Sequence, residues 1–295
     1  MRVSIGGIPY TFHSEVLSER SLREAYFVFA NRIFGLHFDP WYASGFWDGA
    51  FIPYVLYDGD TAVSSVGVCL NEVHWQGTVK RYAQVSTVMT LPAYRGKGLN
   101  RWIMETVLEE WRKKGDAIYL LSNDSAAAYY EKCGFEEYTE CDFTRPVQGK
   151  PTPYRKLSLQ SPSDFELLIE KYKLSNPFSA LTVRNICQFV FHCLQFHREH
   201  LYYLEAFGAA VVAEHRGDTL LCHDIYTHGG CTLDDVLAAL ARDDTRTAQL
   251  GFTPLSMEGC TRVPSTEADN HLFVLPGMDN IFKHHRVLFP LLSRA

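Results

Sequence analysis

The sequence predicts an α+β fold arranged as two domains. Several segments carry apolar residues at three- and four-residue spacing, which is typical of amphipathic helices. Other segments are rich in Val, Thr and aromatic residues and end at Gly-Asp turns, which is typical of strands in hairpins. The chain has 295 residues, which favours about two domains over one.

The first half is predicted to alternate between helices and strands. A helix over 15–34 ends at Gly35 and is followed by a ring-rich loop or short helix over 37–48. The segments that follow are predicted, in order, as strands 51–57, 61–70 and 78–89, helix 100–114, strand 117–121, helix 125–133 and an extended stretch 135–143.

A domain boundary is predicted at Arg145–Pro153, a segment with three prolines, one glycine and no periodicity. The domains are therefore expected at 1–147 and 148–295. In the second domain, Ser163 or Asp164 is expected to cap the first helix. Its predicted elements are helices 163–172, 183–197 and 233–241 and strands 201–214 and 219–226.

One pattern occurs in both halves. Gly59-Asp60-Thr61 and Gly217-Asp218-Thr219 each join two strand-like segments, and each is followed by a helix and then by a Gly-Phe pair, Gly134-Phe135 and Gly251-Phe252. The second interval is much shorter, so a repeat would be truncated. Chance recurrence of a common turn is the open alternative.

Composition excludes several classes of protein. The net charge of −6 argues against a general nucleic-acid binder, which usually carries a basic surface. The eight cysteines form no C-x-x-C pair, so we expect reduced thiols and a cytoplasmic protein. We expect neither a signal peptide nor a membrane partner, because no apolar run approaches the roughly 18 residues that span a bilayer.

The segment Thr90–Asn100 carries the most specific chemical signal. A predicted strand leads into it and a predicted helix leads out, and Gly96 and Gly98 let the backbone curl around an anion. Free N–H groups at the helix start then face that concavity, and Arg95 and Lys97 add positive charge. The spacing is not that of a Walker loop or a dinucleotide fingerprint. A solvated basic turn is the alternative.

The residues around this loop resemble the GNAT N-acetyltransferases. Arg95-x-x-Gly98-x-Asn100 is similar to the family's Arg/Gln-x-x-Gly-x-Gly/Ala signature. Downstream, Asn123, Ala126, Tyr130 and Gly134-Phe135 are similar to its Asn-x-x-Ala-x-x-x-Tyr-x-x-x-Gly-Phe block, in the same order. The resemblance covers roughly residues 10–145. It implies a mixed, bent sheet that splays between the strands predicted at 78–89 and 117–121, with acyl-CoA in the splay.

The resemblance also implies the residues that bind acetyl-CoA, the expected cosubstrate. Backbone groups of Val88 and Thr90 would pair with the pantetheine arm, and residues 95–101 would hold the pyrophosphate. An N–H near Met89 or Thr90 would stabilise the oxyanion at a strand bulge. The full predicted set is Val88, Met89, Thr90, Arg95, Gly96, Lys97, Gly98, Leu99, Asn100, Arg101, Asn123 and Tyr130.

Two positions bear on catalysis, and one departs from the family pattern. Tyr130 matches the family's tyrosine and is predicted to protonate the departing thiolate, with simple packing as the alternative. Asn100 stands where Gly or Ala is usual, but it is small and favours a helix start.

The general base is the weakest part of the sequence prediction. Some relatives carry a glutamate eleven residues before the signature arginine, and Gln84 stands there in this chain. An amide takes up no proton at neutral pH, although it can orient a water. Glu72 and His74 are candidates for a base acting through water, and ordinary exposed strand residues are the alternative for both.

Two other groups of residues are candidate sites. The rings of Phe38–Trp47 stand where the resemblance implies an acceptor site, and core packing is the alternative. Cys193, His197 and His200 can share a helix face, but no fourth ligand suggests itself and the spacing is not a known zinc pattern. No metal is predicted.

The second half lacks the phosphate-binding signature. Its corresponding turn leads to Leu233-Asp234-Asp235, which is acidic where a phosphate would sit. One prediction is a truncated GNAT-like half that does not bind CoA. Such a half would complete the acceptor cleft or form a homodimer contact. An unrelated cap domain is the other.

Three functions stay open on the sequence. The first is an N-acetyltransferase that acts on a primary amine of a small molecule or peptide. The second is a CoA-binding sensor without turnover, and the third is an acyltransferase that uses another acyl-CoA or acylates oxygen.

Overall fold

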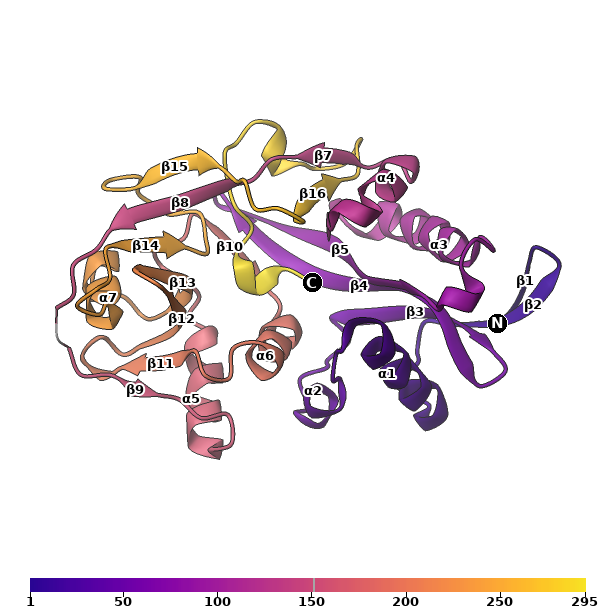
Figure 1. Cartoon of the computed structure of the whole chain (residues 1–295), viewed down its shortest axis with the longest axis horizontal. Helices are drawn as coiled ribbons and strands as arrows, with labels where there is room; N and C mark the ends of the chain where they lie inside the picture. The colour runs from indigo at the N-terminus through magenta and orange to yellow at the C-terminus, as the bar shows by residue number, and fades with distance from the viewer. Residues whose placement is uncertain (151) are drawn as a thin grey trace.

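The computed structural model describes residues 1–150 and 152–295, which form two mixed sheets flanked by helices (Figure 1). The predicted α+β class is confirmed. Pro151, inside the predicted boundary segment, lies outside the described residues. None of the helices in the described part of the chain is long and apolar enough to cross a membrane.

The first sheet contains the strands predicted at 51–57, 61–70, 78–89 and 117–121, the second of which runs on to Trp75. The extended stretch predicted at 135–143 divides into two strands, one in each sheet. The order of the first sheet is β1 (Arg2–Ile5), β2 (Ile8–His13), β3 (Phe51–Asp58), β4 (Thr61–Trp75), β5 (Thr78–Thr90), β6 (Ala117–Ser122), β16 (His271–Val274) and β7 (Glu136–Tyr138), with β10 (Leu181–Arg184) beside β4. Its helices are α1 (Arg20–Phe34), α2 (Asp39–Ala43), α3 (Leu99–Lys114) and α4 (Asp124–Lys132).

The second sheet follows a related order. Its strands are β15 (Thr261–Pro264), β8 (Cys141–Pro146), β14 (Thr247–Leu250), β13 (Thr219–Tyr226), β12 (Ala209–Arg216), β11 (Leu201–Leu204) and β9 (Arg155–Lys156). Its helices are α5 (Pro162–Tyr172), α6 (Ile186–Gln195) and α7 (Leu233–Leu240), and four short 3-10 helices complete the chain: η1 (Pro92–Tyr94), η2 (Glu205–Phe207), η3 (Ile281–Lys283) and η4 (Leu291–Ser293).

The two sheets share a core topology. In each, three antiparallel strands are followed by a helix and then by a strand parallel to the third: β3–β4–β5–α3–β6 in the first half and β11–β12–β13–α7–β14 in the second. The third strand of each set carries a bulge, β5 at Thr87 and Val88 and β13 at His223. The Gly-Asp-Thr turns do not stand at equivalent places in the two sets, since the first joins β3 to β4 and the second joins β12 to β13. The topology is therefore repeated, but the sequence pattern does not mark the repeat.

Each sheet contains a strand from the other half of the chain. β16 lies between β6 and β7 of the first sheet. β8 lies between β14 and β15 of the second sheet (Figure 1). β10 also joins the first sheet, at the far end of β4. The predicted boundary after residue 147 therefore falls between strands of one sheet, β8 and β9, and division into 1–147 and 148–295 stays a prediction.

Several predicted elements differ in their limits, and the helix expected at 15–34 begins only at Arg20. The expected strand 201–214 is interrupted by η2, where Gly208 adopts φ +55°, so it forms two strands instead of one. The expected helix 183–197 begins only at Ile186, because the residues before it pair with β4 as β10. α5 is capped by Ser161, whose side chain accepts from the Asp164 N–H, so the predicted caps Ser163 and Asp164 are wrong.

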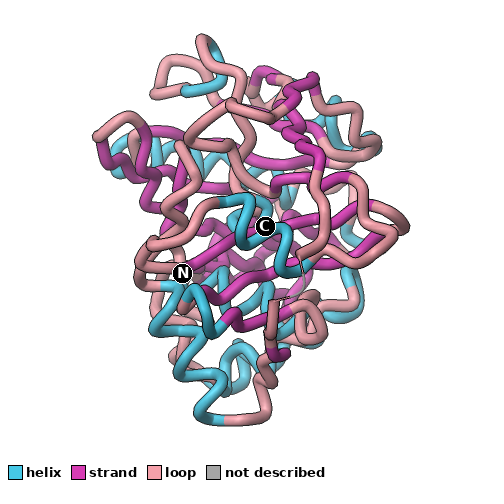
Figure 2. The backbone as a smooth tube through the Cα atoms, turned by 90° about the vertical axis from the view of Figure 1, so that its left-hand side faces the viewer, coloured by secondary structure: helices cyan, strands magenta, loops and turns pink. Residues whose placement is uncertain are grey.

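The last residues of the chain run between the two halves. In both views the C-terminus lies near the middle of the molecule (Figure 1, Figure 2). The Leu291 N–H donates to Gly251 O at 2.8 Å, and the Arg294 guanidinium donates to Glu140 Oε2 at 2.7 Å. We refer to residues 288–295 as the tail.

Candidate active site

β5 and β6 separate at the place where the sequence predicts a splay. They pair in parallel only from Tyr82–Val85 to Ala117–Leu120, and β5 then continues to Thr90 without β6. This free stretch of β5 carries a bulge, because Thr87 and Val88 stand opposite Val66 alone, between the pairs Ser65–Met89 and Gly67–Ser86. The predicted splay and bulge are both present.

The bulge has a local cause. A Cβ on Gly67 would lie 2.3 Å from Thr87 Oγ1 and 2.7 Å from the Phe51 ring, so only glycine fits there. Thr87 itself has φ +41°, a conformation that costs energy for a β-branched residue. The Ser65 hydroxyl donates to Thr87 O at 3.1 Å and helps to hold this geometry.

The basic loop is exposed and shaped as predicted. Gly96 and Gly98 have φ +74° and +79°, and Arg95, Lys97 and both glycines are accessible to solvent. α3 begins at Leu99 with no side-chain cap and no acidic residue in its first turn. Its first N–H groups are therefore free to bind an anion, and the helix dipole favours one. The Arg101 guanidinium forms an ion pair with Glu105, with Nε and Oε1 2.9 Å apart.

Asn100 links three elements around the splay. Its Nδ2 donates to Ser65 O at 3.0 Å beside the bulge and to Met89 O at 3.4 Å near the end of β5. Its Oδ1 accepts from the Tyr129 hydroxyl at 2.7 Å. The departure from the family's small residue therefore adds a bridge between the two motif blocks.

The second motif block forms the start and end of α4. Asn123 caps this helix, since its Oδ1 accepts from the Ala126 N–H at 3.1 Å. Tyr130 is buried, and its ring centroid lies 6.1 Å from that of Phe273 on the exchanged strand β16. Burial raises the pKa of Tyr130 above its ordinary value, so the hydroxyl keeps its proton at neutral pH.

Gln84 is fully buried on β5 beside the tail. In the amide orientation that satisfies its neighbours, its nitrogen donates to Ser293 O at 3.0 Å and its oxygen accepts from the Ala295 N–H at 2.9 Å. The side-chain amides of Asn71 and Gln188 lie 3.3 Å from the Gln84 amide and belong to the same polar cluster. The structure thus places Gln84 against the tail, and its predicted catalytic role stays a prediction.

Glu72 and His74 lie on the far part of β4, away from the bulge. Glu72 Oε1 and His74 Nε2 are 2.5 Å apart, and the Glu72 side chain is about half exposed (53%). Glu72 lines a surface hollow with Lys80 and Arg81. The structure therefore brings neither residue to the place where β5 and β6 separate.

The rings of Phe38–Trp47 pack mainly into the core. Phe38 and Trp41 are buried, and the Trp41 ring stacks on Trp47 with centroids 4.1 Å apart. The Trp41 indole N–H donates to Cys187 O at 2.8 Å, which joins this segment to α6 of the second half.

A cavity of about 790 Å³ lies between the two halves. It reaches Leu121, the β6 residue that follows the last β5–β6 pair, so one end of it lies beside the place where these strands separate. Its other walls come from β8, α6, the second sheet and the tail. They include Asp142, His197, His223, Glu267 and Arg294.

The second-half residues considered for a metal do not form one site. Cys193 is buried in the main core, whereas His197 lines the cavity. Within residues 1–150 and 152–295, no group of three His, Cys, Asp or Glu side chains could hold a metal ion.

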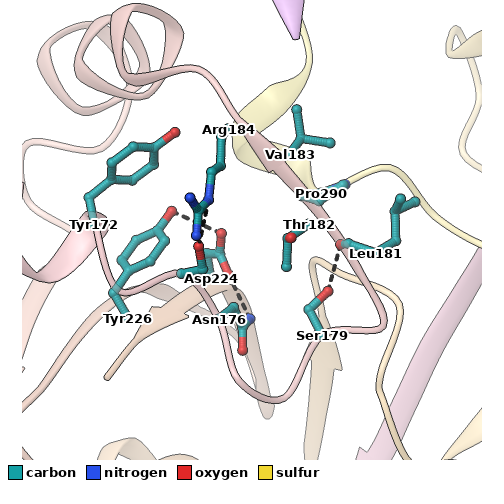
Figure 3. A pocket seen from close by; sticks show the side chains of 11 residues that line it. Tyr172, Asn176, Ser179, Leu181, Thr182, Val183, Arg184, Asp224, Tyr226 and Pro290 are labelled. Carbon is teal, nitrogen blue, oxygen red and sulfur yellow. Dashed lines mark hydrogen bonds between the residues drawn. The ribbon is translucent and has the colours of Figure 1, made fainter. Parts of the chain in front are cut away.

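A small hollow near Asp224 is a structural polar cluster. Figure 3 shows Tyr226 and Asn176 reaching this carboxylate, with hydrogen bonds of 2.8 and 2.6 Å. Burial raises the pKa of Asp224 to about 6. These hydrogen bonds satisfy the carboxylate, and the hollow has room for little more than a water molecule.

Sequence reasoning missed Tyr129, Glu214, His223 and the tail as parts of this region. Tyr129 was passed over because Tyr130 matched the motif. The other three are far from the motifs in sequence, and only the pairing of the halves brings them close.

The comparisons with known proteins agree with this geometry. The model of the acetyltransferase (GNAT) domain matches residues 48–138, which include the bulge, the basic loop and Tyr130. No curated protein sequence matches the chain.

Solved structures share the fold over most of the chain. A GCN5-related N-acetyltransferase from Kribbella flavida is 18% identical, with a TM-score of 0.56, over 90% of this chain and 70% of that one. Eis1 from Mycobacterium abscessus is 13% identical, with a TM-score of 0.57, over 89% and 72%. A probable N-acyltransferase from Enterococcus faecalis V583 is 12% identical, with a TM-score of 0.58, over 90% and 73%.

These matches confirm the resemblance and the fold that the sequence predicted. The likeness covers the second half as well as the first, and the splay, bulge and basic loop stand at the matched positions. The chain therefore carries an acetyltransferase (GNAT) domain at residues 48–138, and the protein is an acyltransferase of that fold.

Proposed function

We propose that the protein is an acetyl-CoA-dependent N-acetyltransferase that acts on a primary amine of a small molecule or peptide. The observation that carries the proposal is the exposed loop Arg95–Gly98, which leads from the splay to an uncapped helix start. A diphosphate fits this loop, and a thioester arm fits beside the free end of β5.

The cavity between the halves is the proposed acceptor cleft. Its end at Leu121 lies beside the splay, so an amine in the cavity can reach a thioester that enters from the loop side. The amine attacks the carbonyl carbon, and a backbone N–H near Met89 or Thr90 stabilises the oxyanion. The Tyr130 hydroxyl then protonates the departing sulfur.

The second half is proposed to bind no acyl-CoA of its own. The gap past the last β13–β14 pair is occupied by η4, since the Leu291 N–H bonds Gly251 O and Leu292 is buried. Asp234 and Asp235 also stand in the first turn of α7, where a phosphate would be repelled.

An acetyl-transfer assay tests the proposal. The protein is incubated with acetyl-CoA and n-butylamine, 1,4-diaminobutane, glucosamine or glycinamide, and free thiol and acetylated amine are both measured. The proposal expects equal amounts of the two products with at least one amine. Tight acetyl-CoA binding without acetylated product favours the sensor, and turnover only with longer acyl-CoA esters favours the other acyltransferase.

A further inference from the structure

Three histidines of the second half line the cavity side by side. His192 lies on α6, His197 just after it, and His223 on β13. Ring centroids are 6.1 Å apart for His192 and His197 and 4.4 Å apart for His197 and His223. The rings therefore form a continuous row from the second sheet toward the tail, where His192 Nε2 lies 2.5 Å from Arg294 O.

A carboxylate stands at the other end of this row. Glu214 Oε1 lies 3.5 Å from His223 Nε2, and Glu214 Oε2 lies 3.7 Å from His200 Nε2. Arg216 also pairs with Glu214. A carboxylate behind an imidazole fixes the ring and its tautomer and compensates a positive charge on it.

Three ring nitrogens of this row are not satisfied by hydrogen bonds with any of the described residues. Both nitrogens of His223 and Nδ1 of His197 are buried without a hydrogen-bond partner in the part of the chain that the structure describes. A proton on His223 Nε2 would face Glu214, and the His223 ring packs on His197 without a hydrogen bond between them. With the proton of its neutral ring on Nδ1, His197 keeps an unshared electron pair on Nε2, and this ring is partly exposed in the cavity.

The surroundings keep His197 neutral at physiological pH. Burial lowers its pKa to about 4, His200 and Arg216 act in the same direction, and Glu214 opposes them. The groups that face the ring are His192 on its own side, His200 in the following turn, and Glu214, Arg216 and His223 from the second sheet. A neutral ring is able to accept a proton.

We propose that His197 is the general base of the acetyl transfer, with His223 and Glu214 as positioning residues. This rests on the proposed function. As the amine nitrogen forms its bond to the carbonyl carbon and the carbon–sulfur bond breaks, one N–H proton passes to His197 Nε2. The sulfur takes the Tyr130 proton, and water returns both residues to their starting forms.

This assignment supplies the group that the first half lacks. Gln84 is an amide that binds the tail, and Glu72 and His74 lie away from the splay. The second half, which is proposed to bind no CoA, would thus supply the base for the reaction in the first half.

The test compares His197→Phe with His215→Phe, using whichever of the four amines the wild-type protein acetylates fastest. His215 lies on β12 outside the cavity and also has an unpaired buried nitrogen, so it is a matched control. We expect His197→Phe to lower kcat/KM about 10²–10⁴-fold with unchanged acetyl-CoA affinity. Added imidazole should restore part of the rate. His215→Phe should keep the wild-type rate.

A second variant separates positioning from folding. His223→Phe removes two unpaired nitrogens from a buried site, so a positioning role predicts a lower kcat with an unchanged KM and a melting temperature at or above wild type. A structural role predicts a lower melting temperature instead.

The outcomes distinguish the two proposals. An unchanged rate and pH profile in His197→Phe overturn the inference and leave the proposed function intact. A wild-type protein that acetylates none of the four amines overturns the proposed function, and the inference with it.

Discussion

Tyr130 owes its position to residues from both halves of the chain. Its ring packs against Phe135, with centroids 6.3 Å apart, and against Phe273 of the exchanged strand. Because burial keeps the hydroxyl protonated, the side chain meets one requirement of the proton donor that we propose. The motif predicts Tyr130 for this role, whereas Phe273, which packs against it, lies far outside the motif.

Replacing Tyr130 with Phe should slow turnover while leaving acetyl-CoA binding nearly unchanged. A thiol has a pKa of about 8.5, so its anion already leaves well, and we expect a loss near the lower end of the usual ~10²–10⁴-fold range. Steady-state kinetics and calorimetric titration with acetyl-CoA measure the two effects. Tyr138→Phe, on β7, is the control, and an unchanged kcat in Tyr130→Phe would remove the assignment.

The histidine row should make the protein sensitive to acid. Burial lowers the pKa of His192 and His197 to about 4 and that of His223 to about 2. Below pH 6.5 the unfolded chain therefore binds more protons than the folded one, and stability falls as the pH falls. At pH 4.5, each ring that stays buried and neutral lowers the free energy of unfolding by about 2–3 kcal/mol relative to its value at pH 7.

His223→Phe should reduce this acid sensitivity. Denaturant unfolding at pH 7 and pH 4.5 measures it in wild type and variant. Asp224, whose pKa is raised, has the opposite pH dependence between about pH 4 and 6, but it contributes equally to both proteins. Equal loss of stability in the two proteins would show that His223 is not buried as a neutral ring.

Helices and strands that pair with neighbours close in the sequence could be predicted. Strands that pair with the other half of the chain could not. β3, β5 and α3 follow hydrophobic periodicities and end at Gly or Pro, so their spans were expected within a few residues. β10 and β16 have four residues each, and their partners lie more than a hundred residues away in the chain. A strand that short carries too little periodicity to reveal its partner.

The hydrogen bonds of Asn100 hold β4, β5 and α4 together. Asn100→Ala restores the small residue of the family but removes the bonds to Ser65, Met89 and Tyr129. We expect the free energy of unfolding to fall by about 1–3 kcal/mol, with acetyl-CoA affinity changed less than about threefold. Chemical denaturation and calorimetry check both values. Thr106→Ala, on the same helix, is the control, and loss of cofactor binding would mean that Asn100 contacts CoA directly.

At the scale of the whole molecule, strand exchange should make the two halves unfold together. β16 fills a place inside the first sheet and β8 a place inside the second, so neither sheet is complete without the other half. Scanning calorimetry of the full chain should show one transition with equal calorimetric and van't Hoff enthalpies. Two resolved transitions, or a cooperatively folded fragment 1–147, would contradict this.

The two parts of the site differ in how far they could be predicted. The cofactor loop is local, because two glycines, two basic residues and a helix start are consecutive in the chain. The cavity is assembled from β6, α6, the second sheet and the tail. Its histidines all belong to the second half and meet where the turn after α6 packs against β13. His197 was noticed in the sequence for its spacing from Cys193, which proved to be a core residue.

The most direct measurement is a calorimetric titration of acetyl-CoA into the full chain and into Gly98→Val. Gly98 has φ +79°, so a branched side chain there strains the loop and crowds the phosphates. We predict one binding site per chain and an affinity at least about tenfold weaker in the variant. Two sites per chain, or an affinity that Gly98→Val leaves unchanged, would contradict a single cofactor site in the first half.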